Sequence, residues 1–243
     1  MNKFTIIDFV LHTSMAMPRE VDLAKTYYHG TSKEENAKNI LQNGIQPPDL
    51  TLKKKHKLTP VKGKVYITPA LDYALIYALG ANMIGQDMSK DSDITVKKEF
   101  YGYIFVIDGK QLKDIQPDED GVGEILYDYI AAKNGETTVA GSGLDKEQLL
   151  KLEWLDNLAK QVLTPLQYPK VIRYDDYADF AVAGKKLNNS MSERQKLELI
   201  DAGAHIAHGG EIGFKECWKI DKRRSQELNR DGSNFFQIAE RIK

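Results

Sequence analysis

Short apolar segments alternate with polar, glycine-containing segments along the 243 residues of this chain. Segments rich in β-branched and aromatic residues predict strands, and they lie at 4–11, 27–28, 65–67, 101–107, 171–174, 180–183, 211–214 and 218–220. Apolar residues at three- and four-residue steps predict helices, which lie between Ser32 and Gly44 and at 70–79, 124–133, 146–163 and 192–202. Because strands and helices are interspersed without a regular βαβ alternation, the pattern predicts an α+β fold.

The stretch Tyr27–Ser32 predicts a short strand that ends in a His-Gly turn. Thr31 or Ser32 then caps the next helix, and Gly44 ends it. A rigid scaffold can direct a side chain at a strand end into a cleft, so His29 is a candidate functional residue.

A second stretch, Gly63–Pro69, has the same organisation. It predicts a strand over Val65–Ile67 and then a helix that begins at Ala70 and reaches Leu79. Tyr66 therefore lies at another strand end, within about fifty residues of the His-Gly turn.

Composition narrows the class of protein. With 42% hydrophobic and 28% charged residues, the chain is typical of a globular protein with a substantial core. The net charge of -1 provides no overall basic field for nucleic acid. The basic run Lys53–Lys57 is interpreted as a solvated loop, with phosphate binding as the alternative. The single cysteine, Cys217, excludes an internal disulfide framework and fits a reducing, cytoplasmic location.

No targeting, membrane or metal signal is expected. The apolar stretch 1–17 is interrupted by Asp8 and His12, which indicates a strand or edge element rather than a signal peptide. No run of about eighteen apolar residues is present, so no membrane span is expected. His205 and His208 lie three residues apart, but two histidines are too few for a closed zinc site.

The organisation over residues 26–80 resembles the ADP-ribosyltransferase superfamily, in particular the His-Tyr-Glu branch shared by poly(ADP-ribose) polymerases and diphtheria-type toxins. In that branch a His-Gly-Thr/Ser strand is followed by a helix, a Gly-x-x-Tyr-like strand and a second helix with another Tyr. Tyr77 follows Tyr66 by eleven residues, as in the polymerases. The family usually has Ser at the position of Ala74, so one hydroxyl expected to hold the nicotinamide carboxamide is missing here.

The resemblance implies a fold and a co-substrate. It implies a single domain over 1–243, with a split pair of antiparallel sheets, a dinucleotide cleft between them and a mostly helical elaboration at about 110–168. NAD+ would be the co-substrate, bound without a Rossmann turn, because Gly121–Gly123 lacks the third glycine of that fingerprint.

The resemblance also assigns roles to single residues. His29 would hydrogen-bond a ribose hydroxyl, and Gly30 would offer its backbone N–H and C=O to the carboxamide, with Thr31 completing this NAD-binding motif. Tyr66 and Tyr77 would pack against the nicotinamide ring. The alternative for His29 is a histidine of the protein core. The alternative for Tyr66 is an aromatic residue of the strand core, and for Tyr77 it is ordinary helix packing.

The carboxylate would come from the glycine-rich stretch His208–Phe214, which is similar to the third motif of the family. Glu211 would accept a hydrogen bond from the ribose 2′-hydroxyl and stabilise the oxocarbenium-like transition state. Glu216 is the second candidate and Glu124 the third. The alternative for Glu211 is an exposed glutamate at a strand edge.

The function expected from these residues is transfer of mono-ADP-ribose from NAD+ to a macromolecular acceptor, protein rather than nucleic acid, with release of nicotinamide. Hydrolysis of NAD+ is a neighbouring alternative. An RNA 2′-phosphotransferase also begins with His-Gly-Thr, but Val65–Ile67 lacks the basic residues that branch requires. Two further alternatives are an inactive module that binds NAD or ADP-ribose, and an α+β domain with a different role.

Overall fold

The computed structural model describes residues 26–48, 61–80, 100–135, 146–162, 177–202, 204–229 and 232–243. The described chain forms two compact units: unit 1 contains the segments Leu23–Asp114 and His208–Lys243, and unit 2 contains Ile115–Ala207. The strands expected at 4–11 and 171–174 and the basic run lie outside the described residues. Among the helices that are described, none is long and apolar enough to cross a membrane.

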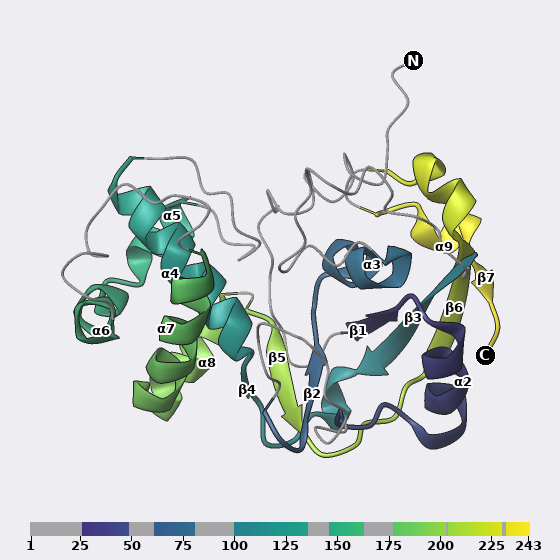
Figure 1. The fold of residues 1–243 in the computed structure, drawn as a ribbon, viewed down its shortest axis with the longest axis horizontal. Helices are drawn as coiled ribbons and strands as arrows, with labels where there is room; N and C mark the ends of the chain where they lie inside the picture. Colours follow the sequence, from purple (N-terminus) through teal and green to yellow (C-terminus); the bar gives the residue numbers. More distant parts are fainter. Residues whose placement is uncertain are drawn as a thin grey trace. The chain divides into compact units, whose positions relative to one another are not determined.

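Unit 1 contains a four-stranded sheet with the order β1-β3-β6-β7. Its strands are β1 (Thr26–Thr31), β3 (Tyr101–Asp108), β6 (Glu216–Asp221) and β7 (Glu240–Arg241). All three pairings are antiparallel, and the register places His29 opposite Phe105 and Phe105 opposite Cys217. The central strand β3 is apolar or aromatic at nearly every position, as expected for a strand buried on both faces (Figure 1).

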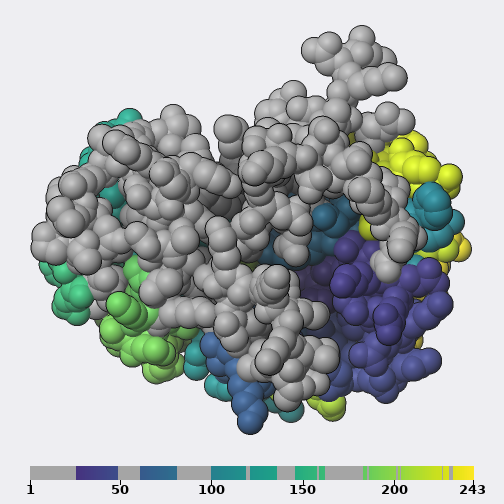
Figure 2. Space-filling model, viewed as in Figure 1, coloured from purple at the N-terminus to yellow at the C-terminus, as the bar shows by residue number. Residues whose placement is uncertain are grey.

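Two helices of unit 1 pack against β1 and β3. They are α2 (Glu34–Asn43) and α3 (Leu71–Leu79). Gly44 ends α2 with φ 73°, and Gly80 ends α3 in the left-handed region, so both stop where glycine predicts. Figure 2 shows the solvent-exposed side of residues 26–48, which include α2, in purple on the surface of unit 1.

The backbone of α3 lies unusually close to the sheet. A Cβ atom on Gly30 of β1 would lie 2.0 Å from the Ala74 carbonyl oxygen, and one on Gly102 of β3 would lie 2.2 Å from the Ala78 carbonyl oxygen. Any side chain at either glycine would therefore collide with helix backbone. Ala74 and Ala78 are four residues apart on one face of α3 and are fully buried, so small residues meet on both sides of this contact.

Strand β2 (Lys64–Ile67) connects the two helices of unit 1 and lies beside β1. Tyr28 and Thr68 form an antiparallel bridge, with N···O distances of 2.8 and 3.0 Å. β2 belongs to a three-stranded sheet with the order β2-β5-β4, in which β4 is Gln116–Pro117 and β5 is Ile206–Gly209. The boundary between the units falls within β5, after Ala207.

Unit 2 is a helical layer with a core of its own. Its helices are α4 (Glu119–Lys133), α5 (Lys146–Lys151), α6 (Trp154–Val162), α7 (Tyr177–Ser190) and α8 (Glu193–Asp201). The most deeply buried side chains include Ile125, Leu126, Ile130, Leu149, Leu155 and Leu187. Ser192 begins α8 with a complete capping box to Gln195, as its sequence predicts. The expected helical elaboration thus continues beyond residue 168.

The remaining elements lie in unit 1. Those in the described residues are the 3-10 turns η1 (Gly109–Gln111) and η3 (Lys222–Glu227) and the short helix α9 (Phe235–Ile238). Phe235 of α9 is fully buried beside α3.

Several predicted boundaries of unit 1 are wrong. β1 does not turn at His29 and Gly30 but continues to Thr31, because both residues pair with β3. Neither Thr31 nor Ser32 caps α2; the cap position is Lys33, without a side-chain hydrogen bond. The predicted strand at 211–214 is reduced to a single bridge between Ile45 and Ile212, since Gly210, with φ 84°, ends β5 first.

Unit 2 also departs from the sequence pattern. The helix predicted at 146–163 breaks after Lys151, where short i→i+3 bonds, such as Leu155 N–H to the Leu152 carbonyl, turn the chain. The strand predicted at 180–183 is part of α7, where alanine-rich sequence favours a helix over the β-branched signal. Helix α4 begins at Glu119 instead of residue 124 and includes two glycines.

Candidate functional site

His29 is fixed by the main chain of the neighbouring strand. Its ring is half-buried, and Nδ1 lies 3.0 Å from the Tyr66 carbonyl oxygen. A carbonyl only accepts hydrogen bonds, so Nδ1 must carry the proton. Burial lowers the pKa of His29 below its ordinary value of 6.5, and the bond to Tyr66 opposes this with a smaller effect. The imidazole is therefore neutral at pH 7, with Nε2 as a hydrogen-bond acceptor.

Gly30 exposes a peptide edge. Among the strands that the structure describes, β1 is the outermost of its sheet, and Tyr28 directs its N–H and C=O away from β3, to Thr68. The direction of backbone groups alternates along a strand, so those of Gly30 point to the same outer edge, beyond the bridge. The other side of Gly30 is filled by the backbone of Ala74. Its lack of a side chain is therefore explained by helix packing alone, while its peptide groups face the edge.

Tyr77 lies on α3, whose backbone covers one face of β1 at Gly30. A Cβ on Gly30 would lie 3.1 Å from the backbone nitrogen of Ala78, the atom bonded to the Tyr77 carbonyl carbon. The half-buried Tyr77 ring packs edge-on against Tyr73, with centroids 5.5 Å apart and hydroxyls 3.5 Å apart. Tyr73 and Tyr77 are four residues apart on α3, so their rings lie on one face of that helix.

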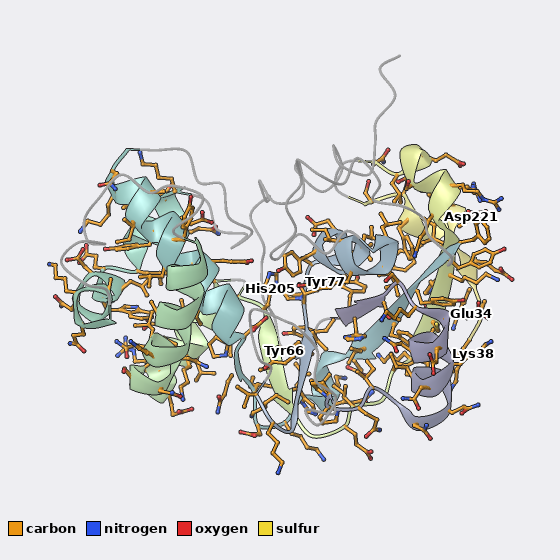
Figure 3. The ribbon with its side chains drawn as sticks, viewed as in Figure 1. Glu34, Lys38, Tyr66, Tyr77, His205 and Asp221 are labelled. Atoms are coloured by element: carbon orange, nitrogen blue, oxygen red, sulfur yellow. The ribbon has the colours of Figure 1, made fainter. Side chains whose placement is uncertain are left out.

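Tyr66 contributes different atoms to two places. Its carbonyl binds His29, and its hydroxyl accepts a hydrogen bond from the Val61 N–H at 2.8 Å. The phenol thus leans back toward the start of β2 and stays half-buried, while Val65 and Ile67 are buried on the other face of the strand. Tyr66 and Tyr77 are labelled in Figure 3, on β2 and α3 of unit 1.

Thr31 and Ala74, at two positions of the predicted motif, are buried and serve the packing of unit 1. Thr31 is buried, and its hydroxyl oxygen lies 3.4 Å from the Lys33 N–H, where it stabilises the connection from β1 to α2. Ala74 is buried against Gly30 and brings no hydroxyl to the edge.

Glu211 projects from a rigid turn at the other end of β2. Its side chain is exposed, and Oε2 accepts a hydrogen bond from Gln46 Nε2 at 3.1 Å. On one side, the Gly210 N–H donates to the Gly63 carbonyl, and on the other side Ile212 exchanges two backbone bonds with Ile45.

The structure places His29 against the Tyr66 carbonyl and Gly30 against the backbone of α3, the helix that carries Tyr77, but it does not place Glu211 in direct contact with any of them in the described residues. Glu211 follows the residue that bonds Gly63, and Tyr66 lies three residues further along, about 10 Å at the rise of a strand. The turn at 61–63 connects the two places: the Gly63 carbonyl accepts a hydrogen bond from the Gly210 N–H, and the Val61 N–H donates one to the Tyr66 hydroxyl.

The second and third candidate carboxylates, Glu216 and Glu124, contribute to the packing of the fold. Glu216 accepts the indole N–H of Trp218 at 2.7 Å and pairs with Arg241 at 3.3 Å. Glu124 is buried in α4 of unit 2.

Sequence reasoning missed a polar cluster beside Glu211. The buried Lys64 ammonium lies 2.6 Å from Asp114 Oδ2 and 3.0 Å from the Asp114 carbonyl, and Asp114 has φ 45°. His208 is buried, with Nδ1 3.0 Å from the Lys113 N–H and Nε2 3.3 Å from the Glu211 carbonyl. Both ring nitrogens are thus engaged by main chain. Only the alternation of β2, which puts Lys64 on the Tyr66 face, hinted at this cluster.

No protein-family model, curated protein or solved structure matches this chain. The resemblance to ADP-ribosyltransferases therefore remains a prediction that rests on local motifs.

Proposed function

We propose that this protein binds NAD+ along the outer edge of β1 and transfers its ADP-ribose to a macromolecular acceptor, releasing nicotinamide. The single observation that supports this best is the edge itself. Gly30 presents an N–H and a C=O there, directly after the neutral His29 and on a strand that α3, the helix of Tyr77, covers on one face.

This edge suits a nicotinamide riboside chemically. A primary carboxamide carries one acceptor and two donors, so it can pair with the N–H and C=O of Gly30 as an added strand residue would. The aromatic rings of Tyr77 and Tyr66 offer flat surfaces for the pyridinium ring. His29 Nε2, as an acceptor, can receive a hydrogen bond from a ribose hydroxyl.

Glu211 is the carboxylate that we propose for the chemical step. The bond between ribose C1′ and the pyridinium nitrogen breaks with both electrons going to nicotinamide, which leaves neutral. Positive charge then builds on the ribose, and a carboxylate stabilises it. The acceptor nucleophile bonds C1′ and gives up its proton to Glu211 or to water. An exposed carboxylate on a fixed backbone is suited to this role.

A second function, binding of NAD or ADP-ribose without cleavage, is favoured by one specific feature. Glu211 lies beside the start of β2, while His29 contacts Tyr66 near its end. If the carboxylate does not reach the ribose, the β1 edge alone makes a binding module.

One experiment separates the two functions. Nicotinamide release from NAD+ is measured for the wild type, Glu211→Gln and the control Glu35→Gln, whose carboxylate is exposed on α2. NAD+ binding is followed in parallel by thermal shift. We expect release by the wild type and Glu35→Gln, a loss of at least about a hundredfold in Glu211→Gln, and equal binding by all three.

The remaining outcomes are also decisive. Binding without release, with cell extract supplied as acceptor, would leave only the binding module. Neither binding nor release would refute the proposal. When release occurs, label from NAD+ on protein indicates transferase activity, and free ADP-ribose indicates hydrolysis.

A further inference from the structure

His208 occupies a position where one side chain joins two separate pieces of main chain. It lies at the end of β5 and is only 2% exposed. Its Nδ1 is 3.0 Å from the Lys113 nitrogen, in the segment that follows η1, and its Nε2 is 3.3 Å from the Glu211 carbonyl oxygen, three residues along its own chain.

These two partners require a single protonation state. The Lys113 N–H only donates, so Nδ1 must be the unprotonated acceptor. The Glu211 carbonyl only accepts, so Nε2 must carry the hydrogen. This is the opposite tautomer to that of His29, whose Nδ1 carries the hydrogen. A doubly protonated His208 ring would keep the Glu211 bond but would direct Nδ1–H at the Lys113 N–H.

The bond to the Glu211 carbonyl completes the fixation of this turn. The Gly210 N–H is bonded to Gly63, and the Ile212 N–H and C=O are bonded to Ile45. His208 is the group that holds the carbonyl between them. The backbone that carries the Glu211 side chain is therefore held at Gly210, at the Glu211 carbonyl and at Ile212, and the group that holds the carbonyl can titrate.

The charged groups around His208 come from three segments. Burial has the largest influence and lowers the pKa of His208, while the bond to the Glu211 carbonyl raises it; Lys64 of β2 and Lys113 lower it further, and Asp114 raises it. The Glu211 carboxylate of its own segment is engaged by Gln46. The surroundings thus favour the neutral ring that both hydrogen bonds need.

We propose that His208 is a positioning residue for Glu211: its neutral ring ties the Glu211 carbonyl to Lys113, and acid protonation breaks the Lys113 half of this tie. The catalytic part of this inference rests on the proposed function of Glu211, whereas the tie itself does not.

Two substitutions of His208 test its two hydrogen bonds separately. His208→Asn places an amide oxygen near the position of Nδ1, so it can keep the Lys113 bond but has no donor that reaches Glu211. His208→Gln places an amide N–H near Nε2, so it can keep the Glu211 bond but offers no acceptor to Lys113. Neither variant titrates between pH 5 and 8.

The first measurement is amide hydrogen exchange of Lys113 in the full chain between pH 5 and 8, relative to the exchange expected for an unstructured amide at each pH. In the wild type we expect protection that falls by about tenfold or more as the pH falls through the lowered pKa of His208. His208→Asn is expected to stay protected throughout, and His208→Gln to be unprotected throughout. Wild-type protection at pH 8 no higher than that of His208→Gln would refute the tie, and wild-type protection that stays constant down to pH 5 would refute its release by acid.

The second measurement is nicotinamide release at pH 7.5. We expect kcat to fall about tenfold or more in His208→Asn, because the Glu211 carbonyl loses its donor, with KM for NAD+ within about twofold. His208→Gln, which keeps that donor, is expected to recover most of the loss. An active wild type with unchanged kcat in His208→Asn would refute the positioning role. No release by the wild type, with the expected Lys113 exchange, would refute the proposed function and leave the tie in place.

Discussion

The two ends of β2 hold their candidate residues in different ways. At the Thr68 end, β1 and α3 meet so closely that a single added carbon on Gly30 would lie 2.0 Å from a helix carbonyl. At the Gly63 end, Glu211 is held by backbone bonds, by Gln46 and by the His208 ring. Packing fixes the first end and polar contacts fix the second.

This difference has consequences for how each end responds to change. Close packing tolerates no extra volume but is insensitive to salt and only weakly dependent on pH. Hydrogen bonds tolerate small changes of volume, but they depend on protonation state and on competition with water. Substitutions at the two ends of β2 should therefore differ in size and in kind.

The largest effect is expected for Gly30→Ala. The new methyl group collides with the backbone of Ala74, which cannot move without moving α3, so unit 1 should lose about 3 kcal/mol of unfolding free energy. Gly213→Ala is the control, because its nearest neighbour is the flexible Gln111 amide at 3.0 Å, and it should lose less than about 1 kcal/mol.

Urea unfolding followed by tryptophan fluorescence measures this loss. The chain has two tryptophans, Trp154 in unit 2 and Trp218 in unit 1, so a Trp154→Phe background reports unit 1 alone. Equal stability of Gly30→Ala and Gly213→Ala would contradict the packing argument.

A smaller effect is expected at the polar end for Lys64→Met. The Lys64 side chain is 11% exposed but its partner Asp114 is 69% exposed, so water can solvate the carboxylate that remains. The loss should be about 1 kcal/mol, well below that for a fully buried pair. Lys38→Met, which breaks an exposed pair with Glu34, should leave the unfolding free energy unchanged in the same urea titrations, because water screens this pair.

Acidification should weaken unit 1 through His29 and His208. Burial lowers the pKa of both rings, so the unfolded chain binds protons at a higher pH than the folded chain does. Their contribution to stability is therefore complete above pH 6.5 and is lost as the pH falls through the folded pKa values. Unfolding free energies measured at intervals from pH 7.5 to 5 should fall; a rise over this range would show that the rings are not held neutral.

The smallest effect is expected for Tyr66→Phe. Tyr66 contacts both ends of β2, because its carbonyl binds His29 and its hydroxyl binds Val61. The variant loses the hydroxyl that accepts the Val61 N–H, but Val61 is 43% exposed and water can replace the bond, so the loss should be about 0.5 kcal/mol. The bond from His29 uses the Tyr66 carbonyl and is kept. Chemical-shift titration of His29 should therefore give the same pKa in both proteins, and a shifted pKa would show that the phenol also positions the ring.

Local sequence predicted the elements whose signals lie within a few residues. Gly44 was correctly read as the end of α2, and Ser192 as the start of α8, since both act through their own backbone or a cap three residues away. The sequence also predicted β3, because an uninterrupted apolar and aromatic run suits a central strand. The His-Gly turn was wrong because pairing of β1 with β3 overrides the turn preference of one glycine.

The sequence by itself indicated the candidate functional residues: His29 and Gly30 on one strand, Tyr66 on the next and Tyr77 on the following helix. Tertiary structure alone decided that Gly30 is required by α3, that Glu211 lies at the opposite end of β2 from the His29 contact, and that His208 joins Lys113 to Glu211. The physical reason is range. Capping, turn and periodicity signals act over a few residues, whereas a steric contact or a hydrogen bond between distant segments exists only after the chain has folded.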